Sequence, residues 1–290
     1  MVDEVERAAD DGGASLPPNA HSGARVMLVD THCHLDAPPL SDDLDGVLAR
    51  ARRAGVETVL VPGVRPEQWA TIAALRDARP HTIATAVGIH PHALPELATS
   101  ELDVALSTIE ETARRLDAHA IGECGLDGEA ARVHGVSLAR QAAVLDVHCE
   151  LARALGLPLV VHVHRAMGAA LAFFEARGPL AHGGVLHGFG GPAELVPRWV
   201  ALGFSFGVGP AVTWTRARRP KEAAKRVPLD RIVLETDGPG TYVEGARGRV
   251  GEPSQVRDVL FALAALRGDD VETLARATND NARRLFRWRA

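Results

Sequence analysis

Short apolar runs alternate with longer amphipathic stretches along nearly the whole chain from Arg25 onward. The runs are rich in β-branched residues, as buried strands are, whereas the stretches between them carry Ala, Leu and Arg at helical spacing. The expected strands are Val26–Val29, Val56–Val61, Thr82–Val87, Ala118–Glu123, Leu159–His162, Gly184–His187, Gly203–Val208 and Ile232–Glu235. The expected helices are Leu44–Ala54, Pro66–Arg79, Glu101–Leu116, Leu138–Leu155, Met167–Ala176, Ala193–Ala201, Arg216–Arg226, Glu252–Leu266 and Val271–Trp288. This alternation predicts an α/β fold with a parallel sheet.

Eight such strands fit a closed (β/α)8 TIM barrel that forms a single domain over residues 25–290. A doubly wound open sheet is the alternative that the pattern leaves open. With 290 residues and 46% hydrophobic content, the chain is long enough to bury one core of barrel size. Residues 1–24 are rich in Asp, Gly, Ala, Ser and Pro and lack apolar periodicity, so we expect a disordered N-terminal tail there.

Composition narrows the class of protein further. No apolar run approaches the roughly 20 residues of a membrane span, and the acidic N-terminus lacks the features of a signal peptide. Cys33, Cys124 and Cys149 form an odd and sparse set, which favours a reduced, cytoplasmic protein. The net charge of −5 does not suggest a large nucleic-acid footprint. A monomer is the expected state.

Two histidines follow the first expected strand, in the run from Asp30 to Asp36. Residues two apart in a strand point to the same side, so His32 and His34 would present two imidazoles to one point. Neutral imidazoles are common metal ligands. An isolated His-x-His is as easily a polar strand end, but similar acids and histidines recur further along the chain. The recurrence favours a metal site.

In a barrel, functional residues should follow the carboxyl ends of several strands, because the active site forms where these ends meet. Other expected strands run into histidines or carboxylates at this end. These runs are Gly88–His92, Ile121–Asp127, His162–His164, His187–Gly191 and Glu235–Pro239. We therefore expect their polar side chains to gather at one face of the barrel.

Taken in order, these motifs resemble those of the TatD family of metal-dependent hydrolases, relatives of the amidohydrolase barrels. The resemblance covers essentially Val26 to the C-terminus. It is carried by Asp30–Asp36, Gly88–Pro91, Gly122–Asp127 and Leu234–Asp237, together with Asn281–Phe286 near the end of the chain.

The resemblance implies a centre of two divalent metal ions (Zn, Mn or Mg). It places one ion on His32, His34 and Asp237, the second on His162 and His187, and Glu123 as a bridge between them. Imidazole suits Zn or Mn better than Mg. Two ions roughly 3.5–4 Å apart activate a shared water, and Asp237 would accept its proton. Asp237 and Glu123 are therefore the expected catalytic residues.

Other residues in these motifs are expected to contact substrate. His90 would touch a substrate oxygen, although a packed, hydrogen-bonded histidine is an equal alternative. Asp127 would orient substrate or a neighbouring ligand. His164 and Arg165 depart from the family's usual His-Ser-Arg-Glu run, and Gly128 replaces a usual Tyr. The metal cage is thus retained while substrate-facing positions have changed.

A basic segment follows the seventh expected strand. Trp214 precedes several cations, which are Arg216, Arg218, Arg219, Lys221, Lys225 and Arg226. Trp214 could stack on a base while the cations contact phosphates, or the segment could be a solvated helix face. An aromatic fraction of 4%, with one tyrosine, leaves few other stacking platforms.

The sequence therefore predicts a divalent-metal-dependent hydrolase of ester bonds. Its expected substrate is DNA, and its expected activity is that of an exonucleolytic deoxyribonuclease, which hydrolyses phosphodiester bonds. The alternative is a hydrolase of a small amide, ester or lactone, because several substrate-facing family residues are replaced. A non-catalytic subunit is disfavoured, since it would have no reason to keep a complete set of ligands.

Overall fold

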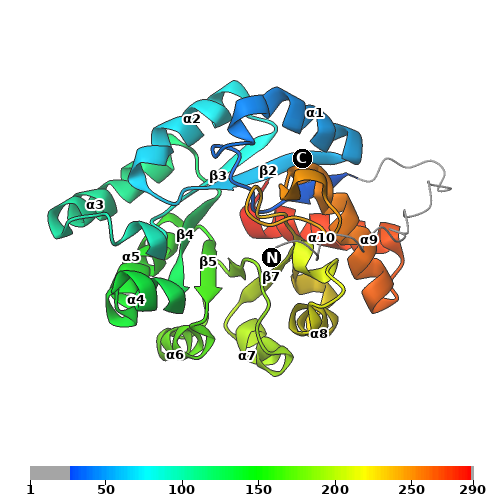
Figure 1. Cartoon of the computed structure of the whole chain (residues 1–290). Coiled ribbons are helices and arrows are strands. Elements are labelled where there is room, and N and C mark those ends of the chain that lie inside the picture. Colours follow the sequence, from blue (N-terminus) through cyan, green and yellow to red (C-terminus); the bar gives the residue numbers. More distant parts are fainter. Residues whose placement is uncertain (1–26, 289–290) are drawn as a thin grey trace, which may run out of the picture.

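A closed parallel barrel forms the body of the protein (Figure 1). The computed structural model describes residues 27–288, so the predicted tail at residues 1–24 lies outside the described residues. Neighbouring strands pair in sequence order from β1 to β8, and the Thr31 N–H donates to the Leu234 carbonyl at 2.9 Å where the last strand meets the first. The strands are β1 Leu28–Asp30, β2 Val56–Pro62, β3 Ile83–Val87, β4 Ala120–Asp127, β5 Leu159–His164, β6 Gly184–Leu186, β7 Phe204–Val208 and β8 Ile232–Leu234. The (β/α)8 barrel is confirmed, and the doubly wound alternative is wrong.

Helices surround the strands on the outside of the barrel (Figure 1). They are α1 Leu44–Ala54, α2 Trp69–Ala78, α3 Thr99–Arg115, α4 Gly128–His134, α5 Leu138–Leu155, α6 Met167–Arg177, α7 Val196–Ala201, α8 Arg218–Arg226, α9 Val256–Arg267 and α10 Val271–Phe286. The bounds of α1 and α5 are those predicted. The short helix α4 was not predicted. It begins where the Asp127 side chain accepts the Ala130 N–H, and it ends at Gly135, whose φ of 69° is left-handed.

Several strand ends differ from prediction in ways that matter for the site. β1 ends at Asp30, one residue later than predicted, and His32 and His34 lie after it, so strand alternation is not what brings their rings together. β4 continues to Asp127 and β5 to His164, because the two strands stay paired over their carboxyl-terminal halves. The polar motifs nevertheless all lie at the carboxyl ends of the strands.

Two layers of apolar packing hold the barrel. Small and β-branched side chains fill its interior, among them Ala84, Ala120 and Val160. Ala282 and Phe286 of α10 pack against the same interior cluster, so this helix covers one end of the barrel. The larger cluster lies between strands and helices. None of the described helices is long and apolar enough to cross a membrane.

Candidate metal centre

Glu123, in the middle of β4, lies among a group of histidines. Its buried carboxylate points one oxygen to each of two pairs of side chains. Oε2 is 3.2 Å from His32 Nε2 and 3.8 Å from His34 Nε2. Oε1 is 3.0 Å from His187 Nε2 and 3.2 Å from His162 Nδ1. Burial alone would raise the pKa of Glu123, but His187, His90 and His32 hold it well below its usual range. An ionised carboxylate that faces two sets of ring nitrogens has the arrangement of a bridging metal ligand.

Asp237 completes the first of these sets. Its Oδ1 is 3.7 Å from His32 Nε2 and 3.6 Å from His34 Nε2, and ligand atoms of these three residues all lie within 4.8 Å of one another. The Asp237 N–H donates to the His32 carbonyl at 2.7 Å, and its φ of 54° is left-handed. Burial would raise the pKa of Asp237, yet the neighbouring His34, His187 and His32 lower it. The carboxylate is therefore ionised at neutral pH.

A buried aspartate that sequence reasoning did not single out aligns this set. Asp30 Oδ1 accepts the N–H of His32 at 3.2 Å and that of Thr236 at 3.0 Å. Its Oδ2 contacts the Thr236 hydroxyl at 2.5 Å, and burial raises the pKa of Asp30 to about 8. Asp30 thus joins the residues after β1 to those after β8. In the sequence Asp30 ends an apolar run and begins the motif Asp30–Asp36, but neither feature shows that it contacts Thr236.

Unpaired buried atoms test whether a cation fits this centre. His32 is fully buried, and neither of its ring nitrogens has a hydrogen-bond partner among the described residues. Burial lowers the pKa of His32, so the ring is neutral and offers a lone pair. Its ring stacks on that of His187 with centroids 4.0 Å apart. Because leaving a buried nitrogen unpaired costs free energy, these residues fit a bound divalent cation.

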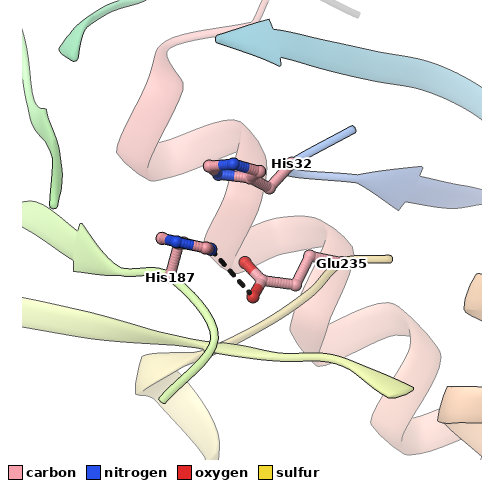
Figure 2. A group of neighbouring side chains, drawn as sticks. All are labelled: His32, His187 and Glu235. Atoms are coloured by element: carbon pink, nitrogen blue, oxygen red, sulfur yellow. Dashed lines mark ion pairs between the residues drawn. The ribbon is translucent and has the colours of Figure 1, made fainter. Parts of the chain in front are cut away.

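Glu235 lies beside His187 and His32 (Figure 2). It faces His187 Nδ1, whereas Glu123 faces the other ring nitrogen, Nε2. Its Oε1 accepts the Gly188 N–H and is 3.8 Å from His187 Nδ1, while its Oε2 is buried without a partner among the described residues. Gly207 makes room for this carboxylate, because a Cβ there would come within 2.0 Å of Oε2. His32, His187 and Glu235 also form a group that could hold a metal ion. Glu235 thus contacts the two residues that follow β6, His187 and Gly188.

His90 reaches the same centre from the residues after β3. Its Nδ1 accepts the His92 N–H at 3.0 Å, so a neutral ring carries its proton on Nε2. That Nε2 is 3.4 Å from Glu123 Oε1. Burial lowers the pKa of His90 to about 4, which keeps the ring neutral. His90 therefore presents an N–H donor to the centre, as expected of a residue that contacts an oxygen.

His148, in α5, holds the start of the segment that carries His90. The ring is completely buried: Nε2 accepts the Ile89 N–H at 3.0 Å and Nδ1 donates to the Val144 carbonyl at 2.8 Å. Sequence reasoning missed His148, because nothing in its helical pattern shows which backbone group it meets.

A cavity of about 220 Å³ opens beside the centre. His162, His164, His187 and Asp237 are among its lining residues. Most of the others are apolar, among them Phe189, Val208, Pro210, Val212 and Pro220. Polar groups that converge beside an apolar wall are typical of ligand-binding sites.

The other predicted substrate contacts fall in different places. Asp127 is buried and contacts His162, not the cavity, at 2.9 Å. Arg165 is exposed and pairs with Glu129 at 2.5 Å. The indole of Trp214 donates to the Tyr242 carbonyl at 2.9 Å and does not line the cavity described here. The roles of Arg165 and Trp214 in substrate binding stay predictions.

Residues 29–287 match the sequence model of the family described as TatD related DNase. The chain belongs to the TatD family. It is 34% identical over 263 residues to YjjV, an uncharacterized metal-dependent hydrolase of Escherichia coli, with 89% of this chain and 97% of YjjV covered. It is 32% identical over 271 residues to the human deoxyribonuclease TATDN3, with 91% and 96% covered. The crystal structure of YjjV superposes with a TM-score of 0.83 at 32% identity and covers 92% of this chain and 100% of that one.

These likenesses establish the class of enzyme. The chain is a metal-dependent hydrolase that acts on ester bonds, and the predicted family and barrel are confirmed. The metal-capable groups around Glu123 agree with a requirement for divalent metal.

Proposed function

We propose that this TatD-family hydrolase cleaves phosphodiester bonds of DNA at a centre of two divalent ions. The division of the Glu123 carboxylate between two pairs of histidines supports the proposal most directly. The proposed ligands are His32, His34, Glu123, His162, His187 and Asp237. Their imidazole and carboxylate groups suit Zn, Mn or Mg, with imidazole favouring the first two.

Each side chain has a proposed task that its geometry supports. When bound, divalent ions supply an activated water and positive charge that stabilises the attacked phosphate. Asp237 is ionised, and its side chain keeps 26% of its surface exposed, so it can accept a proton from that water. The His90 N–H is placed to donate to a phosphate oxygen at the same centre.

DNA is the proposed substrate because of the residues around the cavity. Pro220 and Ala224 of α8 line the cavity, while Arg218 and Arg219 at the start of the same helix are exposed. Cations at this position can contact phosphates of a bound strand, and the apolar wall can contact a base. The cavity is small, so we propose that a strand end enters it, as in an exonuclease.

A second candidate is hydrolysis of a small amide, ester or lactone. The apolar wall formed by Phe189, Pro210 and Val212 favours it, because such a surface would also bind the apolar part of an uncharged substrate. The changes at Gly128, His164 and Arg165 point in the same direction. Both candidates use the same centre and differ only in what binds beside it.

The deciding experiment compares the two classes of substrate. Metal-reconstituted protein is incubated with single-stranded DNA labelled at either end, and in parallel with amides, esters and lactones. We expect stepwise shortening of the DNA from one end. Turnover of a neutral ester with no DNA cleavage would overturn the proposal in favour of the second candidate.

Charge reversal on α8 tests the role of the basic segment. Arg218→Glu with Arg219→Glu should weaken DNA binding and reduce its salt dependence by about 0.7 units of slope for each lost contact to single-stranded DNA. The matched control is Arg114→Glu with Arg115→Glu, an equal change at exposed positions at the end of α3. Unaltered DNA cleavage and salt response in the α8 variant would mean that the segment is only a solvated helix face.

We also propose a monomer in the cytoplasm. Cys33, Cys124 and Cys149 are free and buried, in agreement with a reducing compartment. Light scattering of the purified protein would test the oligomeric state.

A further inference from the structure

Asp127 lies behind the centre and receives three hydrogen-bond donors. Its Oδ1 accepts the Ala130 N–H at 2.8 Å, which begins α4. Its Oδ2 is 2.9 Å from His162 Nε2 and also 2.9 Å from His92 Nε2. Only 1% of the Asp127 side chain is exposed. Because Oδ1 faces a backbone N–H and Oδ2 faces two ring nitrogens, Asp127 is a buried acceptor at both oxygens.

This acceptor determines where His162 carries its proton. A neutral imidazole has one N–H and one bare nitrogen, and the N–H stays on the nitrogen with the better acceptor contact. Both ring nitrogens of His162 lie near a carboxylate: Nε2 is 2.9 Å from Asp127 Oδ2, whereas Nδ1 is 3.2 Å from Glu123 Oε1. The shorter contact to Asp127 keeps the proton on Nε2 and leaves Nδ1 bare. Nδ1 also lies 3.2 Å from His187 Nε2, inside the group of proposed ligands. A metal ion binds only the bare nitrogen.

We propose that Asp127 is a positioning residue that locks His162 with its proton on Nε2, so that its Nδ1 lone pair already faces the centre before a divalent cation binds. The inference rests on the proposed function in one respect, that His162 is a metal ligand. Of the two roles that the sequence left open for Asp127, orienting substrate or orienting a neighbouring ligand, it selects the second.

His92 continues the hydrogen bonds of Asp127 to the surface. It also fixes the ring of His90, with the result that His90 presents an N–H where His162 presents a lone pair. The His92 backbone N–H donates to His90 Nδ1, so His90 shows an N–H to Glu123. The His92 side chain, which is half exposed, donates to Asp127, which also holds His162. Two histidines that face the same oxygen of Glu123 are thus prepared differently. His162 offers a lone pair and His90 offers a proton.

The isosteric substitution Asp127→Asn tests whether Asp127 controls the tautomer of His162 or only packs against it. An amide has only one acceptor oxygen, whereas Asp127 uses both of its oxygens. If the Asn oxygen keeps the Ala130 N–H, its NH2 group faces His162 Nε2 and drives the ring proton to Nδ1. In Asp127→Ala the ring has no partner on that side, so a metal can still select the productive tautomer. The isosteric variant should therefore bind metal more weakly than the truncated one.

Two measurements test the proposal. Nitrogen-15 NMR of histidine-labelled, metal-free protein near pH 9, where ordinary imidazoles are neutral, reports the tautomer of each ring; the spectrum of His162→Gln identifies the signals of His162. We expect a protonated Nε2 and a bare Nδ1 in the wild type, and a shift toward a protonated Nδ1 in Asp127→Asn. Zinc affinity, measured by competition with a chromophoric chelator, should fall about 10- to 100-fold in Asp127→Asn.

The matched control is Asp270→Asn. Asp270 begins α10 by accepting the Thr273 N–H at 2.9 Å, so the control makes the same change at an exposed helix start away from the centre. A wild-type His162 with its proton on Nδ1 would overturn the proposal, and this measurement does not depend on whether either Asp127 variant folds. Wild-type zinc affinity in a folded Asp127→Asn would overturn it as well. If the wild type shows the expected tautomer but binds no zinc, the lock stands and the proposed metal centre fails.

Discussion

Replacing His148 by Gln should remove a defined part of the protein's acid sensitivity. The buried His148 ring accepts the Ile89 N–H through a bare Nε2. Protonation would destroy that acceptor and place a charge in the interior, and burial accordingly lowers the pKa of His148 to about 4. Gln cannot be protonated in this range, yet its side-chain oxygen can still accept the Ile89 N–H.

The sign and size of the effect follow from proton linkage. The unfolded chain binds a proton at His148 below about pH 6.5, whereas the folded protein does so only below about pH 4. Between these values the unfolded state binds more protons, so stability falls as the pH falls. From about pH 7.5 to about pH 5 a single such group costs about 2 kcal/mol of unfolding free energy. His148→Gln should lose stability less steeply by about this amount.

Urea unfolding in EDTA, followed by circular dichroism at both pH values, measures the effect. The other histidines titrate in both proteins, so their contributions cancel in the difference between them. His134→Gln, at an exposed position of α4, controls for the removal of a histidine as such. The reasoning is refuted if wild type and His148→Gln lose stability in parallel between the two pH values.

Three further changes test other parts of the molecule. Asp237→Asn should fold but lose at least about 100-fold in turnover, because it removes a charged ligand and the proposed proton acceptor together; near-normal turnover of the metal-loaded variant would reject that role. Glu123→Gln should bind less metal by elemental analysis, since an amide cannot offer an oxygen to both sides; unchanged metal content would argue against a bridge. Deletion of residues 1–24 should leave the melting temperature and activity unchanged, because that sequence has too little apolar content to repay its ordering by burial. A clear drop in either would show that these residues dock on the barrel.

The fold could be predicted from the sequence because its signals are local and repeat. Each strand overlaps its predicted range, and α5 has the predicted bounds, since β-branched runs and helical periodicity are properties of a few neighbouring residues. The continuation of β4 to Asp127 could not be predicted in this way. Its last residues, Cys124 to Asp127, are extended because they pair with β5, where Gly125 lies opposite His162. α4 was missed for a similar reason, since it depends on one capping side chain.

For the candidate site, the sequence predicted which residues come together but not the partners that orient them. Barrel geometry brings strand ends together, so histidines and acids after several strands could be assigned to one place without knowing their distances. The partners that align them could not be assigned. Asp30 meets the Thr236 N–H across 206 residues and His148 meets the Ile89 N–H across 59, and neither pairing leaves a pattern in a single sequence. Asp127 was recognised as a motif residue, but its role depends on which ring it faces.

Two of the departures from the family pattern touch one another beside this network. A Cβ at position 128 would come within 2.5 Å of the Arg165 carbonyl oxygen, so the close approach of these backbones admits only Gly128. Arg165 itself has a left-handed φ of 49° and turns its side chain to Glu129 in α4. Gly128 and Arg165 are therefore parts of one local arrangement after β4 and β5. Asp127 lies directly before Gly128 and receives donors from Ala130, His92 and His162, so this close backbone contact adjoins the residue that we propose orients His162.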